Sequence, residues 1–591
     1  MRRLMRRLMR PPPARFFALL ALLTLAACAA WATAVLASGS YAEARALDGI
    51  TRHLAWHIRA FGPGDWRTAT GGLAALAGLL GLAALAALAR CPAEARALGR
   101  ELGGSLLAHG RGLARLPRHQ QRLALAGLAG LTALRLYFSL SQPAHAEEIA
   151  SYLWFVRRGL LAVGAYYPVP NNHVLANVVA WGFSRLHPGF WFALRLPVLL
   201  TATVVTTGLF ALGRRVAGFW AALLGTGLFA GLQLSWYFAA AGRGYWLFFG
   251  WAALVLFATL ALGTGTRRPR AAWAALLLGS LGGLYTMPAF AYPALAAWAW
   301  LGASAWQSGG LRRPLRRFWS RALPALLALL GVGATLGAGT ALLYAPLLLV
   351  SGWKALAGNG YVAAQAAGAF WPALPAYVQL AEGMVAGQGT VGGLLTLAVA
   401  GAARYALRGP LPRLLLWWLL APYLWLLVQR VLPPERVLLY KSEALFLLAG
   451  LLVVAGWRRL PATAQRPASA AVALAAAAFV GYQLYQVERL NRTNRRPVAA
   501  YRAAWQWLAR QPAGAALVPD SRQRLYFHFY ACTASGPARV LDAQPLPGRH
   551  YRYRAAPGRA ALAAASAPAA LGVPPAAPAF ANEQVTFWAL P

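Results

Sequence analysis

Acidic residues, lysines and cysteines are scarce in this sequence. Of its 591 residues, 14 are Asp or Glu and 56 are Lys or Arg, so the formal net charge is +42. Lys354 and Lys441 are its two lysines, so nearly all of the positive charge is arginine. The cysteines, Cys28, Cys91 and Cys532, are too few and too scattered to indicate a disulfide framework or a cysteine metal site.

The distribution of the arginines argues against nucleic acid as a partner. A large positive charge indicates nucleic-acid binding when it lies along one soluble face. Here the arginines form short clusters between long apolar runs, which is typical of the cytoplasmic loops of membrane proteins. We therefore expect no nucleic-acid partner.

Long runs of apolar residues are the main feature of the sequence. Hydrophobic residues make up 59% of the chain, and the mean hydropathy is +0.50. Runs of about 18 to 22 apolar residues recur, which is the length that a helix needs to cross ~30 Å of hydrocarbon. The sequence predicts an all-α polytopic membrane protein, with the bilayer lipids as its surroundings.

Charge clusters set the expected orientation. Arginines at positions 2 to 15 precede the first apolar run, which places residue 1 in the cytoplasm. A lipoprotein cleavage site at Cys28 is the alternative, but the apolar run continues past it and favours a signal anchor. About 13 transmembrane helices then follow, at roughly 16–37, 71–89, 123–140, 191–212, 217–238, 245–265, 271–286, 288–305, 322–345, 391–407, 412–428, 437–456 and 468–486.

The run at about 172–186 is treated differently from these spans. If it crossed the membrane, Arg214 and Arg215 would lie on the outer side, and the alternation would clash with the later clusters at Arg312 to Arg321 and at Arg458 and Arg459. The run is also short for a span. We expect it to lie in the outer interface as a juxtamembrane helix, with a short tilted span as the alternative.

Three regions follow from this topology. Residues 1–122 form a two-helix membrane extension with a basic cytoplasmic loop, and residues 123–486 form the transmembrane core, with outer loops at 141–190 and 346–390. Residues 487–591 contain no run long enough to span and are expected to form a small extracytoplasmic C-terminal α/β domain. Its alanine- and proline-rich stretch at 563–580 is expected to be a flexible loop.

Polar chemistry is concentrated at residues 145–173. Glu147 and Glu148 are adjacent there, with His145 before them. A carboxylate at the outer membrane surface is a candidate general base, because transfer of a group to a hydroxyl or amine needs a proton acceptor. The alternative is that both carboxylates only stabilise the N-terminus of the helix that follows.

Four cations are expected at outer helix ends on the same side as this acidic pair. They are Arg243, Lys354, Arg436 and Lys441. Groups of this kind can hold a lipid-linked phosphate and stabilise it as it leaves. Contact with anionic lipid headgroups is the alternative role for each of them.

The order of short motifs through the core resembles that of a known family. HAEEIASYLWFVRRG is followed by YYPVPNNHVL, LRLPVLL, ALGRRVAG, GRGYWLFF, LYTMPAFAYP, YAPLLLVSG and LPPERVLLY. This order, over roughly residues 123–486, resembles glycosyltransferase family 39, the protein O-mannosyltransferase-like group of the C-type (GT-C) membrane glycosyltransferases, whose relatives include aminoarabinose transferases. The resemblance implies a GT-C-like fold in a bacterial inner membrane.

The resemblance also implies an activity and its residues. It implies inverting transfer of a sugar from a polyprenyl-phosphate donor to a lipid, glycan or protein acceptor on the extracytoplasmic face. The base of that group is an Asp often followed by Glu, and the matching positions are Glu147 and Glu148. Arg243 and Tyr245 match its Arg-x-Tyr element, but Gly242 stands where an acid often precedes that arginine.

Further candidates lie in the Tyr-Pro and Asn-Asn-His stretch of the same loop. Those for substrate binding are Tyr167, Asn171, Asn172 and His173. His145 and Glu148 are candidates for holding a divalent metal, with structural hydrogen bonding as the alternative role for the histidines. Two other functions stay open, a transporter or flippase of lipid-linked saccharide and a non-catalytic membrane relative.

Overall fold

The computed structural model describes residues 11–47, 61–309, 315–358, 362–387, 389–512, 514–533, 539–558 and 578–590. The arginines before residue 11, part of the first predicted outer loop, Arg312 and nearly all of the alanine- and proline-rich stretch lie outside these residues.

Helices make up most of the described chain. In order, they are α2 (Ala14–Ala37), α3 (Tyr41–Ala46), α5 (Pro63–Arg90), α6 (Pro92–Ala114), α7 (Arg118–Ser141), α8 (Ala146–Ala150), η2 (Ser151–Phe155), η3 (Val156–Arg158), α9 (Leu160–Ala165), α10 (Val174–Leu186), η4 (Trp191–Arg195), α11 (Leu196–Ala217), α12 (Phe219–Ala230), α13 (Gln233–Ala240), α14 (Tyr245–Thr264), α15 (Pro269–Thr286), η5 (Pro288–Phe290), α16 (Ala291–Gly309), α17 (Leu315–Val350), α18 (Trp353–Ala357), α19 (Ala367–Ala386), η6 (Gly389–Val391), α20 (Gly392–Ala406), α21 (Pro410–Gln429), η7 (Glu435–Tyr440), α22 (Lys441–Trp457), α23 (Ala462–Arg510) and α24 (Ser521–Thr533).

Within the described residues, nine helices are long and apolar enough to cross a membrane. They become ten if α12 and α13, which are bent by 64° at a short break, form one broken span. The remaining three predicted spans form α15, α16 and α20, and each is shorter or less apolar than those nine. The protein is an all-α polytopic membrane protein.

The helix predicted to lie in the interface is α10. It has 13 residues, which makes it about 20 Å long at 1.5 Å per residue, too short to cross the hydrocarbon core. This length agrees with the expectation that the segment does not cross the membrane, and its place in the outer interface stays a prediction.

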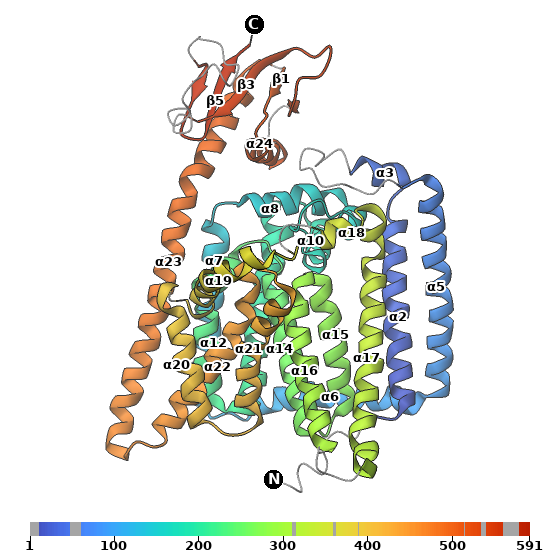
Figure 1. Ribbon diagram of the computed structural model, residues 1–591. Helices are drawn as coiled ribbons and strands as arrows, with labels where there is room; N and C mark the ends of the chain where they lie inside the picture. Colours follow the sequence, from blue (N-terminus) through green and yellow to red (C-terminus); the bar gives the residue numbers. More distant parts are fainter. Residues whose placement is uncertain are drawn as a thin grey trace.

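The two ends of the helix bundle differ (Figure 1). One end carries α3, α8, α10 and α18, and α6 lies across the other end. Two of the arginines expected to share a side with α6 contact it: the Arg268 Nη1 donates to Ser105 Oγ of α6 at 3.0 Å, and the Arg270 Nε donates to Glu94 Oε2 at 2.8 Å.

Glycines allow close packing inside the bundle. The α12–α22 pair is an example, because a Cβ at Gly450 would lie 2.4 Å from the Ala221 carbonyl oxygen. At Gly225, on the facing helix, a Cβ would lie 2.9 Å from the Leu447 Cα. Small residues let helices approach closely in a bilayer, where dispersion contacts drive their association.

The C-terminal region forms a small mixed sheet with one helix. Its strands are β1 (Ala515–Leu517), β2 (Leu541–Asp542), β3 (Tyr551–Pro557), β4 (Phe580–Ala581) and β5 (Val585–Ala589), in the order β2-β1-β3-β5-β4. β1 pairs in parallel with β2 and β3, and β5 pairs antiparallel with β3 and β4. We call residues 514–590 the sheet unit; its α/β character agrees with the prediction from the sequence.

A single helix joins the bundle to the sheet unit. α23 has 49 residues and runs from the last predicted span up to the sheet, so residue 487 lies within it (Figure 1). The sheet unit then packs back onto the bundle: the Phe529 ring of α24 lies 5.0 Å from that of Phe190, and the Tyr526 hydroxyl donates to the Ala144 carbonyl oxygen at 3.3 Å. α24 therefore covers the segment around α8.

Candidate functional site

The acidic pair lies in the first turn of α8, at the end of the bundle beneath the sheet unit (Figure 1). His145 is the N-cap residue, and its backbone N–H donates to Glu148 Oε2 at 3.1 Å. A π-helical turn, Ser151–Phe155, follows at once. Adjacent helical residues point in different directions, so the two carboxylates have separate surroundings.

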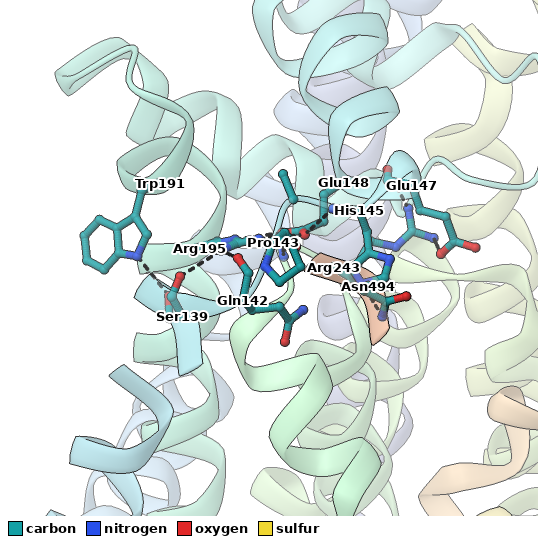
Figure 2. Close-up of polar contacts among 12 residues, drawn as sticks. Ser139, Gln142, Pro143, His145, Glu147, Glu148, Trp191, Arg195, Arg243 and Asn494 are labelled. Atoms are coloured by element: carbon teal, nitrogen blue, oxygen red, sulfur yellow. Dashed lines mark hydrogen bonds and ion pairs between the residues drawn. The ribbon is translucent and has the colours of Figure 1, made fainter. Parts of the chain in front are cut away.

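Glu148 is fully buried and satisfied by hydrogen bonds (Figure 2). Its Oε1 accepts from Arg195 Nε at 2.9 Å and from the Gly242 N–H at 2.7 Å. Its Oε2 accepts from Arg195 Nη2 at 2.9 Å and from the His145 N–H. With its lone pairs used in this way, Glu148 is suited to hold the fold of the site together and less suited to accept a proton from a substrate.

Arg195 is held just as firmly at the other side of the ion pair. Its Nη1 donates to the carbonyl oxygens of Ser139 and Gln142 at 2.8 Å each, and Nη2 donates to that of Pro143 at 3.3 Å. Arg195 ends a π-helical turn, Trp191–Arg195, and the indole N–H of Trp191 donates to Ser139 Oγ at 2.9 Å. The Glu148–Arg195 pair thus fixes α8 against the ends of α7 and α11.

The pKa of the Glu148 carboxyl reflects this environment. Burial raises the pKa, but the Arg195 guanidinium and the Gly242 and His145 backbone N–H groups more than offset burial, so the pKa is lowered. Glu148 is therefore ionised near neutral pH.

Glu147 is the accessible carboxylate of the pair. Its side chain is 46% exposed, and it lies between two guanidinium groups, with Arg436 Nη2 3.2 Å from Oε1 and Arg243 Nη2 3.4 Å from Oε2. Burial raises its pKa, whereas Arg243, Arg436 and His145 lower it by more, so the pKa is lowered overall. Glu147 is an ionised carboxylate that solvent or a substrate can reach.

Arg243 connects Glu147 to the Asn-Asn-His stretch. Its side chain is 4% exposed. Nη1 donates to the Ser151 hydroxyl at 3.2 Å, to the Asn171 carbonyl oxygen at 3.1 Å and to Asn171 Oδ1. Nη2 faces His173 Nε2 at 3.2 Å. Five of the residues singled out from the sequence therefore come together in the site: Glu147, Asn171, His173, Arg243 and Arg436.

Both ring nitrogens of His173 face N–H donors, although a neutral ring can accept only one hydrogen bond. Its Nδ1 lies 2.9 Å from the Gly244 N–H, and its Nε2 faces Arg243. Burial, Arg243 and Arg436 lower its pKa well below the usual value, so the ring is neutral and accepts at one nitrogen only. One of the N–H groups around the His173 ring therefore lacks an acceptor. Arg243 Nε is also buried without a hydrogen-bond partner among the described residues. Surplus buried donors of this kind suit an anionic oxygen.

An apolar cavity adjoins this surplus of donors. It lies between α10, α11 and α14, and is lined by Ala176, Val179, Ala180, Leu194, Pro197, Val198, Thr201, Gly242, Arg243, Trp246 and Leu247. Arg243 is its charged residue, so the cavity combines an apolar wall with a guanidinium at one place.

The other residues singled out in the loop have internal roles. The Asn172 amide is buried and donates to the carbonyl oxygens of Val163 and Tyr166 at 2.9 Å each. Tyr167 is buried, and its backbone N–H donates to Ser351 Oγ at 2.8 Å. Tyr245, at the start of α14, is buried with its ring stacked on Phe238, 3.7 Å between centroids, and edge-on to the His173 ring, 5.2 Å between centroids. Asn172 and Tyr167 therefore hold the loop in place, whereas Tyr245 borders the site.

The two lysines are separate from the Glu147 cluster. Lys354 is exposed on α18, at the same end of the bundle (Figure 1). Lys441 is fully buried and forms an ion pair with Glu382, while its Nζ lies 4.0 Å from the centroid of the Tyr423 ring. Lys441 begins α22 directly after η7, which carries Arg436, so its ion pair anchors the segment that reaches Glu147.

The residues predicted to hold a metal do not fit that role. The carboxylate oxygens of Glu148 already accept hydrogen bonds from Arg195 and two backbone N–H groups. His145 Nε2 faces the Asn494 amide of α23 at 3.2 Å. Among the described residues, no group of three or more His, Cys, Asp or Glu side chains is placed to hold a metal ion.

Gly242 has a steric reason to be glycine. A Cβ there would lie 2.7 Å from Leu194 Cβ and 3.4 Å from Glu148 Oε1. A side chain would collide with Leu194 of η4, and a carboxylate would be repelled by Glu148. The backbone N–H of Gly242 is used instead, as a donor to Glu148.

Three residues of the site were missed from the sequence. Arg195 lies in the quoted motif LRLPVLL, but without structure nothing separates it from the other arginines. Ser151 and Asn494 carry no sequence signal of their own. For Arg195, its place inside an apolar string, at the start of a predicted membrane helix and with no acid near it in sequence, is the one clue that could have indicated a distant acidic partner.

Comparison with known proteins gave structural matches alone. No family model and no curated protein matches the chain. Two similar solved structures are of ArnT from Cupriavidus metallidurans. The one bound to undecaprenyl phosphate has 15% identity and a TM-score of 0.47, over 79% of this chain and 98% of that chain. The apo structure has 15% identity and a TM-score of 0.48, over the same shares. ArnT is a GT-C aminoarabinose transferase, the group that the sequence motifs resemble.

Proposed function

We propose that this protein is a membrane glycosyltransferase that moves a sugar from a polyprenyl-phosphate donor to an acceptor hydroxyl or amine, with inversion. The observation that carries the proposal is the accessible Glu147 carboxylate held between Arg243 and Arg436, next to buried donors that lack acceptors. A base and a phosphate site within one cluster are what such a transfer needs.

Glu147 would act as the base and Arg243 as the main phosphate ligand. The acceptor oxygen or nitrogen attacks the anomeric carbon while its proton passes to the Glu147 carboxylate. The bond from that carbon to the phosphate oxygen breaks, and polyprenyl phosphate leaves with the electron pair, which the guanidinium groups stabilise. A single displacement of this kind inverts the anomeric centre. The apolar side chains beside Arg243, among them Val198 and Leu247, would contact the first part of the lipid chain.

The site would lie on the extracytoplasmic face of the bacterial inner membrane. The opposite end of the bundle carries Arg268 and Arg270, which contact α6, and Arg214, which lies beside Gly112 of the same helix. Arginine-rich ends are cytoplasmic under the positive-inside rule. The Glu147 cluster and the sheet unit are at the other end (Figure 1).

A binding experiment tests the phosphate site. The full-length protein in detergent is titrated with undecaprenyl phosphate or with undecaprenol, which lacks the phosphate, while its thermal unfolding is followed. The phosphate form should raise the unfolding midpoint, undecaprenol should raise it much less, and Arg243→Gln should remove the difference. Equal shifts with both lipids would overturn the phosphate assignment.

A turnover experiment tests the base. Proteoliposomes receive a panel of undecaprenyl-phosphate sugars together with cell-envelope lipids, and the release of undecaprenyl phosphate is measured. Glu147→Gln should lower the rate by about 10²- to 10⁴-fold, the usual contribution of a general base. Glu435→Gln, the same substitution at the residue before Arg436, is the matched control and should stay active. Wild-type turnover by Glu147→Gln would contradict the proposal.

A transporter or flippase of lipid-linked saccharide is the second candidate. It is favoured by Glu443, a buried residue of α22 whose two carboxylate oxygens have no partner among the described residues, and by Arg135, which is buried in α7. Ionisable residues within membrane helices often mark transport paths. Loss of lipid translocation in Glu443→Leu, with no sugar transfer by the wild type, would favour the transporter.

A further inference from the structure

α6 lies across the end of the bundle opposite the acidic pair (Figure 1). It connects α5 to α7, and its 23 residues pack below α2, α11 and α15. The orientation differs from that of the long helices, which run from one end of the bundle to the other (Figure 1). A helix lying across the end of a membrane bundle has one side toward the protein and other sides available to the membrane surface.

The inner side of α6 is fixed by its acids. Glu94, 3% exposed, accepts from Arg15 Nε at 3.1 Å and from Arg270 Nε at 2.8 Å. Glu101 accepts from Arg270 Nη1 at 3.1 Å and from the Ala271 N–H at 3.0 Å. Residues 94, 101 and 105 share one helical face, because they are separated by seven and four positions. The two acids of α6 are therefore used within the protein.

The outer sides of α6 carry leucines and arginines. Leu102, Leu106 and Leu107 are 42%, 76% and 57% exposed. Arg100 and Arg111 are exposed as well, and no described acidic side chain forms an ion pair with either. On the helix, Leu107 shares one outer side with Arg100 and Arg111, because it lies seven positions after the first and four before the second. Leu102 and Leu106 lie on the opposite flank of the inner face.

We propose that α6 is a docking surface for acidic phospholipid headgroups. A helix with apolar and arginine-bearing sides, lying along a membrane surface, inserts its leucines among acyl chains and places its guanidinium groups at the phosphates. The arginines attract anionic lipids because their charge is not balanced inside the protein. A soluble polyanion would satisfy the arginines but would leave Leu106 in water, so the leucines select the lipid. This surface does not depend on the proposed sugar transfer.

The test compares acidic and zwitterionic lipids on the full-length protein in detergent. Phosphatidylglycerol or phosphatidylcholine is titrated while the thermal unfolding midpoint is recorded at low and high salt. Phosphatidylglycerol should stabilise the protein at lower concentration, and high salt should weaken this preference. Arg100→Gln with Arg111→Gln should raise the half-saturating phosphatidylglycerol concentration about 25-fold, taking about fivefold for each arginine.

A matched double variant serves as control. Arg510→Gln with Arg552→Gln removes two exposed arginines at the far side of the protein and should leave the phosphatidylglycerol preference unchanged. Equal responses to the two lipids, an unchanged preference in the α6 variant, or an equal loss in the control variant would each overturn the proposal. A strong response to a short RNA in place of the lipid would assign the arginines to a soluble polyanion instead.

Discussion

Arg195 binds both oxygens of the Glu148 carboxylate, with Nε–Oε1 and Nη2–Oε2 distances of 2.9 Å each. Neither side chain is open to solvent, at 4% and 1% exposed. The pair joins the first turn of α8 to the turn before α11, and a third partner, the Gly242 N–H, adds the segment that carries Arg243. Glu148 therefore controls where Glu147 and Arg243 stand relative to each other.

Breaking this pair from one side should destabilise the protein. Glu148→Gln leaves the Arg195 charge buried without compensation, and Arg195→Met does the same to Glu148, so each should cost about 3–5 kcal/mol. The double variant should cost less than the sum, because neither charge then remains. Thermal unfolding of the four proteins in one detergent completes the cycle, and strictly additive costs would show that the pair is not coupled.

The proposed transfer should be insensitive to pH above about 5 as far as Glu147 is concerned. The base is active when ionised, and its pKa is lowered from the ordinary value of 4.5. Activity is then lost only as the pH falls through that lowered pKa. Arg436→Gln removes one of the groups that lower it, so the acid limb of the pH–rate profile should move to higher pH. An unmoved limb would mean that another group limits the rate in acid.

Arg243 and Arg436 should differ in their contributions to lipid-phosphate binding. Arg243 is buried in a fixed network and has unused donor capacity, whereas Arg436 is 40% exposed. Charge-assisted hydrogen bonds contribute more when water is excluded, so Arg243→Gln should weaken undecaprenyl phosphate binding by about 10- to 100-fold. Arg436→Gln should weaken it by only a few fold. Both variants are titrated with undecaprenyl phosphate. A larger loss of affinity in Arg436→Gln than in Arg243→Gln would indicate that the phosphate binds nearer to Arg436.

Lys441 should prove to be a positioning residue for the proposed site. Lys441→Met leaves Glu382 buried without its charged partner and should lower the unfolding midpoint. Lys441→Met combined with Glu382→Leu should recover much of the stability and should still bind undecaprenyl phosphate. Binding that disappears in the stable double variant would instead show direct contact between Lys441 and the lipid phosphate.

Apolar periodicity and charge predicted much of the fold. Runs of membrane length became long helices, the short run became α10, and the arginines of one predicted cytoplasmic cluster, Arg268 and Arg270, contact α6. The bend between α12 and α13 was not predicted, because Gly231 alone does not distinguish a broken helix from a straight one. The continuity of α23 into the region after residue 487 was also missed, since polar sequence there reads as the end of a span.

The candidate site was predicted in part. Glu147, Asn171, His173 and Arg243 were singled out from motifs, and the structure brings them together. The different surroundings of Glu147 and Glu148 could not be predicted, because they depend on Arg195, 47 positions away, and on a backbone N–H. Spacing along a chain carries no information on contacts of that kind.

The sheet unit stands at the end of one continuous helix, so a residue count fixes its height and rotation. At 1.5 Å and about 100° per residue, α23 is roughly 70 Å long, and one inserted residue would turn everything beyond it by about a quarter of a circle. The contact between the Asn494 amide and the His145 ring would then be lost, and α24 would no longer pack on the segment around α8. The length of α23 therefore determines whether α24 and the sheet unit lie over the acidic pair.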